Sequence, residues 1–144
     1  MAEKAMLGSS IYIPGVLLGA LETELGNEAT FAKLGCKAKN ELFKDQLRLI
    51  RLDARKHTHL LATAYKAMTG NDAHPTQGPA PELPESLAEG CESMLFTILD
   101  DADIYLRLYS GAPIEIKDIC LELLADNQMN AVKLSHISLS EKSC

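Results

Sequence analysis

Four polar residues interrupt the apolar helical patterns that run through most of the chain. They are Glu24, His57, Asn127 and Asn130. The spacing of the neighbouring apolar residues places all four on faces that would be buried. A buried polar group is unfavourable unless it finds a partner. The four residues therefore predict a polar layer within the core, which is either a set of interhelical hydrogen bonds or a metal site.

The surroundings of His57 are repeated near the C-terminus. Residues 53–57 read Asp-Ala-Arg-Lys-His, and residues 126–130 read Asp-Asn-Gln-Met-Asn. In both segments an aspartate precedes two core positions that are three residues apart. Residues with this spacing lie on one face of a helix. The repeat indicates two related helices.

Four helices are expected to position these residues, and the first two form a pair. The first begins at Pro14, because proline is favoured at the first helical position. Its apolar spacing extends to about Leu34. The second begins after Asn40, a favourable N-cap, and ends at Gly70, a favourable C-terminal glycine.

A second helical pair follows a segment without periodicity. Residues 71–83 contain three prolines and a glycine, and they are predicted to form a crossover. The third helix is expected to begin at Pro84 and to close at Ser110 and Gly111. Pro113 opens the fourth helix.

These elements predict an all-α fold. The expected organisation is an N-terminal arm over 1–12, a bundle over 13–137 with its crossover at 71–83, and a tail over 138–144. Short turns within each pair predict two antiparallel hairpins. A crossover of about 14 residues reaches about 45 Å, and a second helix of about 30 residues is about 45 Å long. The second and third helices can therefore be parallel, although this arithmetic also permits a plain up-and-down bundle.

Composition and charge exclude several classes of function. The chain has 144 residues, enough for one domain with a proper core, and a net charge of −6, which argues against non-specific nucleic-acid binding. An apolar run near the N-terminus is broken by Pro14 and Gly15, and it is too short to cross a bilayer. The four cysteines are Cys36, Cys91, Cys120 and Cys144. None of them forms a CxxC pair, and this pattern is typical of free thiols in a reducing compartment. We expect a soluble cytoplasmic protein.

The frame resembles the ferritin-like superfamily, in particular rubrerythrin and short bacterial ferritin-like proteins. In that family each hairpin carries a Glu on its first helix and a Glu-x-x-His, usually preceded by Asp, on its second. The six ligands hold two iron or manganese ions. Glu24, seven residues before Phe31, fits the first Glu, and residues 53–57 and 126–130 fit the two Asp-Glu-x-x-His frames. The resemblance covers about residues 13–137 and implies a ferritin-like bundle with one long crossover.

Most ligands of the resembled site are replaced here. Only Glu24 and His57 remain. The other four positions hold Ala54, Ile98, Asn127 and Asn130, of which Ile98 lies seven residues before Tyr105. Two divalent cations require several carboxylates. We therefore expect no di-iron site, no ferroxidase or peroxidase activity, and no cofactor.

Three aspartates are candidates for supporting roles. The resemblance implies that Asp53 and Asp126 belong to a second shell, in which Asp126 holds His57 by its other nitrogen. The alternative is that both face solvent or a neighbouring Lys or Arg. Asp101 is the candidate inward member of an acidic cluster, where it would add a carboxylate beside Glu24.

Three functional hypotheses follow. The first is a non-catalytic ferritin-like module. It would act by self-association, by binding a partner protein, or by binding a small ligand in the cavity that holds the metal ions in the resembled family. A homodimer is expected, with Ile11, Tyr12, Val16 and Leu18 as its apolar face. The second is a residual mononuclear Zn, Fe or Mn protein that uses Glu24, His57 and Asp101, with an amide oxygen from Asn127 or Asn130. The third is a different all-α module.

Overall fold

The protein is a bundle of four long helices. The computed structural model describes residues 12–77 and 82–142. The helices are α2 (Ile13–Lys37), α3 (Glu41–Thr69), α4 (Leu87–Gly111) and α5 (Ile114–Lys142), and the described residues contain no strand. The all-α prediction is confirmed. Most of the expected arm at 1–12, part of the crossover at 78–81, and residues 143–144 lie outside the described residues.

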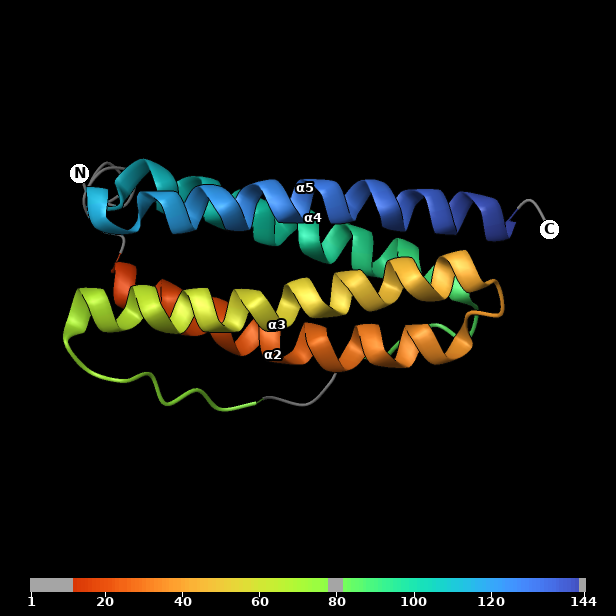
Figure 1. Ribbon diagram of the computed structural model, residues 1–144, viewed down its shortest axis with the longest axis horizontal. Coiled ribbons are helices and arrows are strands. Elements are labelled where there is room, and N and C mark those ends of the chain that lie inside the picture. The colour runs from red at the N-terminus through yellow and green to blue at the C-terminus, as the bar shows by residue number, and fades with distance from the viewer. Residues whose placement is uncertain (1–11, 78–81, 143–144) are drawn as a thin grey trace.

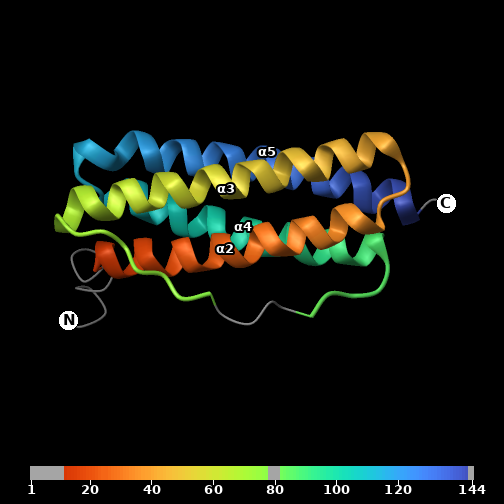
Figure 2. The same cartoon turned by 60° about the horizontal axis from the view of Figure 1, so that its bottom comes forward.

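The helices form two hairpins joined by a long connection (Figure 1). The α2–α3 and α4–α5 pairs pack most extensively, while α3 also packs on α5 and α2 on α4. Helices α3 and α4 run in the same direction, so the connection joins opposite ends of the bundle (Figures 1 and 2). Thr76 donates from its backbone N–H and its hydroxyl to Glu22 Oε2, at 2.9 Å each, which fixes part of the connection to α2. The plain up-and-down alternative does not describe this arrangement.

The ends of α3 are fixed by the residues that the sequence analysis selected. The side chain of Asn40 accepts hydrogen bonds from Leu42 N at 2.8 Å and from Phe43 N at 3.3 Å. Gly70 has φ of 77°, a left-handed conformation that glycine adopts without steric cost, and its N–H donates to Lys66 O. Both capping predictions are confirmed.

The predicted start of α4 at Pro84 is wrong. The helix begins at Leu87, because Ser86 caps it by accepting a hydrogen bond from Glu89 N at 3.1 Å. The Ser86 hydroxyl also donates to Glu89 Oε1, which makes a local cap more favourable than a proline start. The carbonyl oxygens of Pro84 and Glu85 instead accept from Lys37 Nζ at the end of α2.

The boundary expected at residue 137 also differs from the structure. Helix α5 continues to Lys142, through most of the predicted tail. Two contacts with α4 hold this extension: Ser138 Oγ donates to Ala88 O at 2.9 Å, and Lys142 Nζ lies 3.0 Å from Glu92 Oε2. Both contacts join residues distant in sequence, so local patterning does not reveal them.

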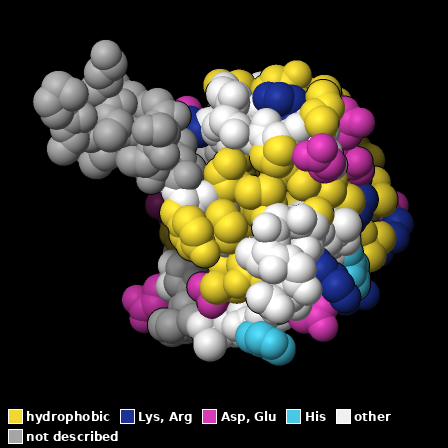
Figure 3. All heavy atoms as spheres, turned by 90° about the vertical axis from the view of Figure 1, so that its left-hand side faces the viewer, with side chains coloured by type: hydrophobic (Ala, Val, Ile, Leu, Met, Phe, Trp, Pro, Cys, Tyr) yellow, Lys and Arg dark blue, Asp and Glu magenta, His cyan; other side chains and the backbone are white. Residues whose placement is uncertain are grey.

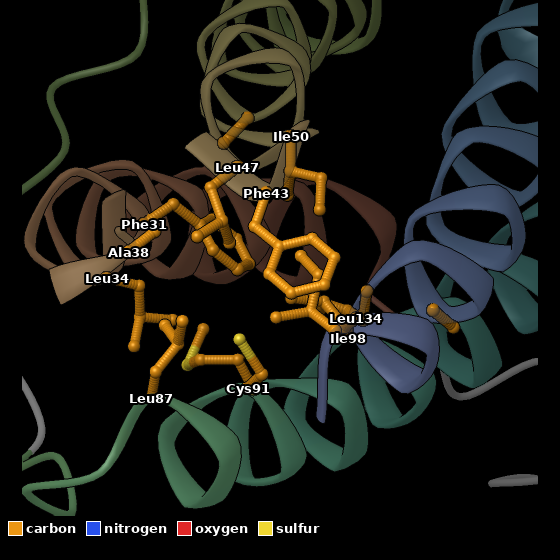
Figure 4. Packing of buried hydrophobic residues seen from close by; sticks show 14 residues of the cluster. Phe31, Leu34, Ala38, Phe43, Leu47, Ile50, Leu87, Cys91, Ile98 and Leu134 are labelled. Atoms are coloured by element: carbon orange, nitrogen blue, oxygen red, sulfur yellow. The ribbon is translucent and has the colours of Figure 1, made fainter. Parts of the chain in front are cut away.

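Two apolar clusters fill the ends of the bundle. The first cluster lies where α2 leads into α3, and Figure 4 shows its side chains converging from all four helices. Its larger members include Phe31, Leu34, Phe43, Leu47, Ile50, Leu87, Met94, Leu134 and Ile137. The second cluster lies towards the opposite end and includes Leu17, Leu21, Leu61, Tyr105, Leu108, Ile116 and Leu123. Burial of each such side chain contributes about 1.5–3 kcal/mol before entropic costs.

Within the described ranges, no helix combines sufficient length with sufficient apolar character for a membrane span. Apolar side chains do gather at the end where α2 and α5 begin (Figure 3), and Tyr12 and Ile114 are among the exposed ones. Cys36, Cys91 and Cys120 are free thiols.

Candidate functional site: a buried polar layer

The polar layer lies between the two apolar clusters, at mid-bundle. Along α2, for example, Leu21 belongs to the second cluster, Glu24 and Asn27 are polar, and Phe31 belongs to the first cluster. The buried polar side chains at this depth are Glu24, Asn27, His57, Asp101, Asn127 and Asn130, none more than 8% exposed. All four helices therefore contribute polar groups at this level.

Glu24 is the centre of the hydrogen-bond network. Its Oε2 accepts a hydrogen bond from the Tyr105 hydroxyl at 2.8 Å and lies 2.8 Å from His57 Nδ1. Its Oε1 accepts a longer bond of 3.4 Å from Asn27 Nδ2. The carboxylate thus joins α2 to α3 and α4, and both of its oxygens have partners.

His57 lies between two carboxylates. Its Nδ1 faces Glu24, and its Nε2 lies 3.0 Å from Asp126 Oδ2 on α5. Burial lowers the pKa of His57, but the hydrogen bonds and charges of Glu24 and Asp126 outweigh burial and raise this pKa above its usual value. An imidazolium that donates from both nitrogens satisfies both carboxylates.

Asp126 connects the buried histidine to the surface. Lys56 Nζ lies 2.7 Å from Asp126 Oδ2 and 3.0 Å from Glu122 Oε2. Burial raises the pKa of Asp126, yet the hydrogen bonds from Lys56 and His57 outweigh it, so the pKa lies below its usual value. Asp126 therefore contacts both the histidine and the lysine that the sequence analysis treated as alternatives.

Asp101 lies at the other end of the network. Its Oδ2 accepts a hydrogen bond from Asn27 Nδ2 at 3.1 Å, so Asn27 separates it from Glu24. Burial, followed by the negative charge of Glu24, raises the pKa of Asp101 to about 7. A continuous chain runs from Asp101 through Asn27, Glu24 and His57 to Asp126.

The two asparagines of α5 lie apart from this chain. Asn127 Nδ2 donates to the backbone oxygen of Ile98 at 3.2 Å, and Asn130 Nδ2 donates to Asp53 Oδ2 at 3.2 Å. Asn130 Oδ1 is buried without a hydrogen-bond partner in the described part of the structure. Neither amide is hydrogen-bonded to His57 or Glu24. They were expected at this depth, but they do not extend the Glu24–His57 pair.

Two members of the network were not selected from the sequence. Asn27 follows Glu24 by three residues, a spacing that places both on one helix face and signals the contact. Tyr105 was noted only as the aromatic residue seven positions after Ile98, although a buried phenol usually finds a hydrogen-bond partner. Both residues donate a hydrogen bond to the Glu24 carboxylate.

The donor set does not fit a pair of metal ions. No cluster of three or more His, Cys, Asp or Glu side chains suited to one ion occurs among residues 12–77 and 82–142. Ala54 and Ile98 stand where the ferritin-like frame would have glutamate ligands, and both are buried apolar residues of the first cluster. Glu24 and His57 have protein partners at both polar atoms of each side chain. Two divalent cations would lack the anionic ligands that bridge them.

Comparison with known proteins adds no assignment. No family model matches the chain, and no curated protein or solved structure matches it.

Proposed function

We propose that this chain is a non-catalytic ferritin-like helical protein that forms a homodimer in the cytoplasm. The sequence frame and the parallel direction of α3 and α4 support the ferritin-like assignment (Figure 1). Free buried thiols at Cys91 and Cys120 support a reducing compartment. In this proposal the polar layer joins the two hairpins and performs no chemistry.

The observation that carries the non-catalytic part is the pairing of His57. A ferroxidase or peroxidase histidine needs a nitrogen available to a redox metal, whereas both nitrogens of His57 face carboxylates at 2.8 and 3.0 Å. Glu24 is likewise engaged by Tyr105 and Asn27. Each of these contacts would have to break before a metal could be bound.

The outer face of α4 and α5 supports self-association. An apolar groove of about 540 Å³ lies between the two helices, with Leu95 and Leu99 on one side and Val132 and Leu139 on the other. Phe96 is 60% exposed on the adjoining surface of α4. A contiguous exposed apolar surface is typical of an interface, and a two-fold dimer joins the same surface of both copies.

The face that the sequence analysis assigned to the first helix is a weaker candidate. Tyr12 is exposed, but Val16 and Leu18 are half-buried, and Val16 packs against the second cluster. Ile11 lies outside the described residues. The structure therefore favours the α4–α5 face.

The dimer is tested by multi-angle light scattering over a concentration series. We expect the unmodified chain to have the mass of a dimer and Val132→Glu to have that of a monomer, because a carboxylate cannot be buried in the apolar groove. Leu42→Glu is the matched control, since Leu42 is 56% exposed at the start of α3, away from the groove. A monomeric unmodified chain, or a dimeric Val132→Glu variant, would contradict the proposed interface.

One observation favours a second candidate, a mononuclear metal site. His57 Nδ1 points to Glu24 while Asp126 holds Nε2, which is how an outer carboxylate orients a ligating histidine. A single Zn, Fe or Mn ion would have to replace the hydrogen bond between Glu24 and His57, with Asp101 as a third ligand after Asn27 moves. Binding of about one ion per chain that is lost in His57→Ala would support this candidate. Equal binding by the variant would exclude this ligand set.

A further inference from the structure

A small cleft opens between α2 and α4, next to the polar layer. Its volume is about 300 Å³, near the lower limit for small-molecule sites. Val16 and Ala20 of α2 and Ile104 of α4 form apolar walls, and Asp101 and Tyr105 also line it. Gly19 leaves the α2 side open, because a Cβ built there would meet nothing within 4 Å.

Asp101 lines this cleft and has one carboxylate oxygen that accepts no hydrogen bond from the described part of the chain. The residue is only 8% exposed, and its Oδ2 accepts the hydrogen bond from Asn27. No hydrogen bond to Oδ1 occurs among the described residues. The Tyr105 hydroxyl is directed to Glu24 and does not satisfy Asp101. A largely buried carboxylate that lines an apolar cleft therefore has one oxygen without a protein donor among the described residues.

We propose that the cleft binds a small amphipathic amine, with its ammonium group on Asp101 and its hydrocarbon against Val16, Ala20 and Ile104. A charge-assisted hydrogen bond from an ammonium group satisfies the carboxylate better than a neutral donor does. The surroundings also favour a cation. Glu24 lies one side chain further into the bundle, and Asp100 is exposed on α4 next to Asp101 in the sequence.

Neither His57 nor Arg107 is paired with Asp101. His57 lies beyond Glu24, on α3, and its ring nitrogens face Glu24 and Asp126. The exposed Arg107 of α4 pairs with Asp103 at 3.0 Å. The cleft belongs to the α2–α4 face and the proposed dimer groove to the α4–α5 face, so the two proposals can fail separately.

Two probes of nearly equal size test the site in the full chain. Hexylamine, cationic at about pH 8, and hexan-1-ol, neutral, are titrated separately while backbone amide shifts are followed by NMR. We expect saturable shifts at Gly19 and Ile104, and about tenfold or more tighter binding of the amine than of the alcohol. In Asp101→Asn this preference should disappear. The variant should keep its fold, because an asparagine oxygen can still accept from Asn27.

A second variant tests the location without changing charge. Gly19→Phe places a ring in the cleft and should abolish binding of both probes. Gly26→Phe is the matched control, since Gly26 also lies on α2 with nothing within 4 Å of a built Cβ but does not line the cleft. Equal affinities for amine and alcohol, unchanged amine binding in Asp101→Asn or Gly19→Phe, or no saturable binding at all would overturn the proposal.

Discussion

His57 Nε2 on α3 lies 3.0 Å from Asp126 Oδ2 on α5, although the two residues are 69 positions apart in the sequence. This contact joins the two hairpins, because α3 belongs to the first and α5 to the second. Glu24 adds the links from α3 to α2 and, through Tyr105, to α4. The polar layer thus connects all four helices at one depth.

The Asp126→Asn variant tests the charge at this junction. Removing the carboxylate should lower the pKa of His57, because one of the two anions that favour the imidazolium is lost. The stability should fall by about 1–2 kcal/mol, since a neutral amide oxygen accepts from the buried imidazolium less strongly than a carboxylate does. NMR titration of the His57 ring and denaturant unfolding measure the two effects. Asp118→Asn, at an exposed position on the same helix, should change neither; an unaltered His57 titration in Asp126→Asn would refute the role of the carboxylate.

The raised pKa of Asp101 predicts that the free energy of unfolding decreases as pH rises. This pKa is about 7 in the folded chain, above its usual value of 3.8. Between these two values the folded state binds more protons than the unfolded state, so the free energy of unfolding decreases with rising pH. The raised pKa of His57 acts in the same direction, because stability from its protonated form is lost as pH rises through the folded pKa.

The Asp101→Asn variant isolates the first contribution. At about pH 8 it should be more stable than the unmodified chain by about 2–4 kcal/mol, because the buried carboxylate no longer ionises. Near pH 4 the two proteins should have similar stability. Urea unfolding at both pH values checks this, and a variant that is less stable at the higher pH would show that ionised Asp101 stabilises the fold.

The Tyr105→Phe variant tests the support of Glu24. Phenylalanine fills nearly the same volume but cannot donate to Glu24 Oε2, so the fold should lose about 1.5–3 kcal/mol. Tyr109→Phe on the same helix is the control, because the Tyr109 ring lies under Lys117 Nζ without a hydrogen bond from its hydroxyl among the described contacts. It should change stability by less than about 0.5 kcal/mol. Equal effects of the two substitutions would be inconsistent with the proposed network.

Substitution by alanine should have opposite effects on stability at Gly70 and at Gly26. Gly70→Ala should destabilise the protein by about 1 kcal/mol, because alanine tolerates the positive φ of 77° poorly. Gly26→Ala should stabilise it by about 0.5–1 kcal/mol, since Gly26 lies within α2 and a Cβ there meets no atom within 4 Å. Thermal unfolding of both variants measures the difference, and a gain in stability at Gly70 would contradict the assigned C-cap.

Local signals in the sequence were sufficient for most of the fold. Asn40 and Gly70 act on backbone groups of their own helix, so residue type and position predicted both caps. The predicted start of α4 was wrong because Ser86 and Glu89 form a more favourable cap than Pro84 provides. The predicted end of α5 was wrong because α4 holds the last turns of this helix, through contacts with Ala88 and Glu92.

The sequence predicted which residues of the candidate site are buried, but it predicted only some of the contacts between them. Interrupted apolar spacing indicated that Glu24 and His57 would be buried, and the structure places them in contact. The same spacing does not show which atoms meet, since that depends on the rotation of four packed helices. Asp101 was considered as a neighbour of Glu24, yet Asn27 lies between them. The contact of Tyr105 with Glu24 was not predicted, because the spacing of residues does not reveal where a hydroxyl points.

The most direct test of the central claim is the metal content of the purified, untagged protein. Elemental analysis follows anaerobic incubation with Fe(II), Mn(II) or Zn(II) and removal of free ions. A polar layer satisfied by its own hydrogen bonds predicts well below one ion per chain with each metal. Two tightly held ions per chain would contradict the account, because they would require ligands that Ala54 and Ile98 cannot supply.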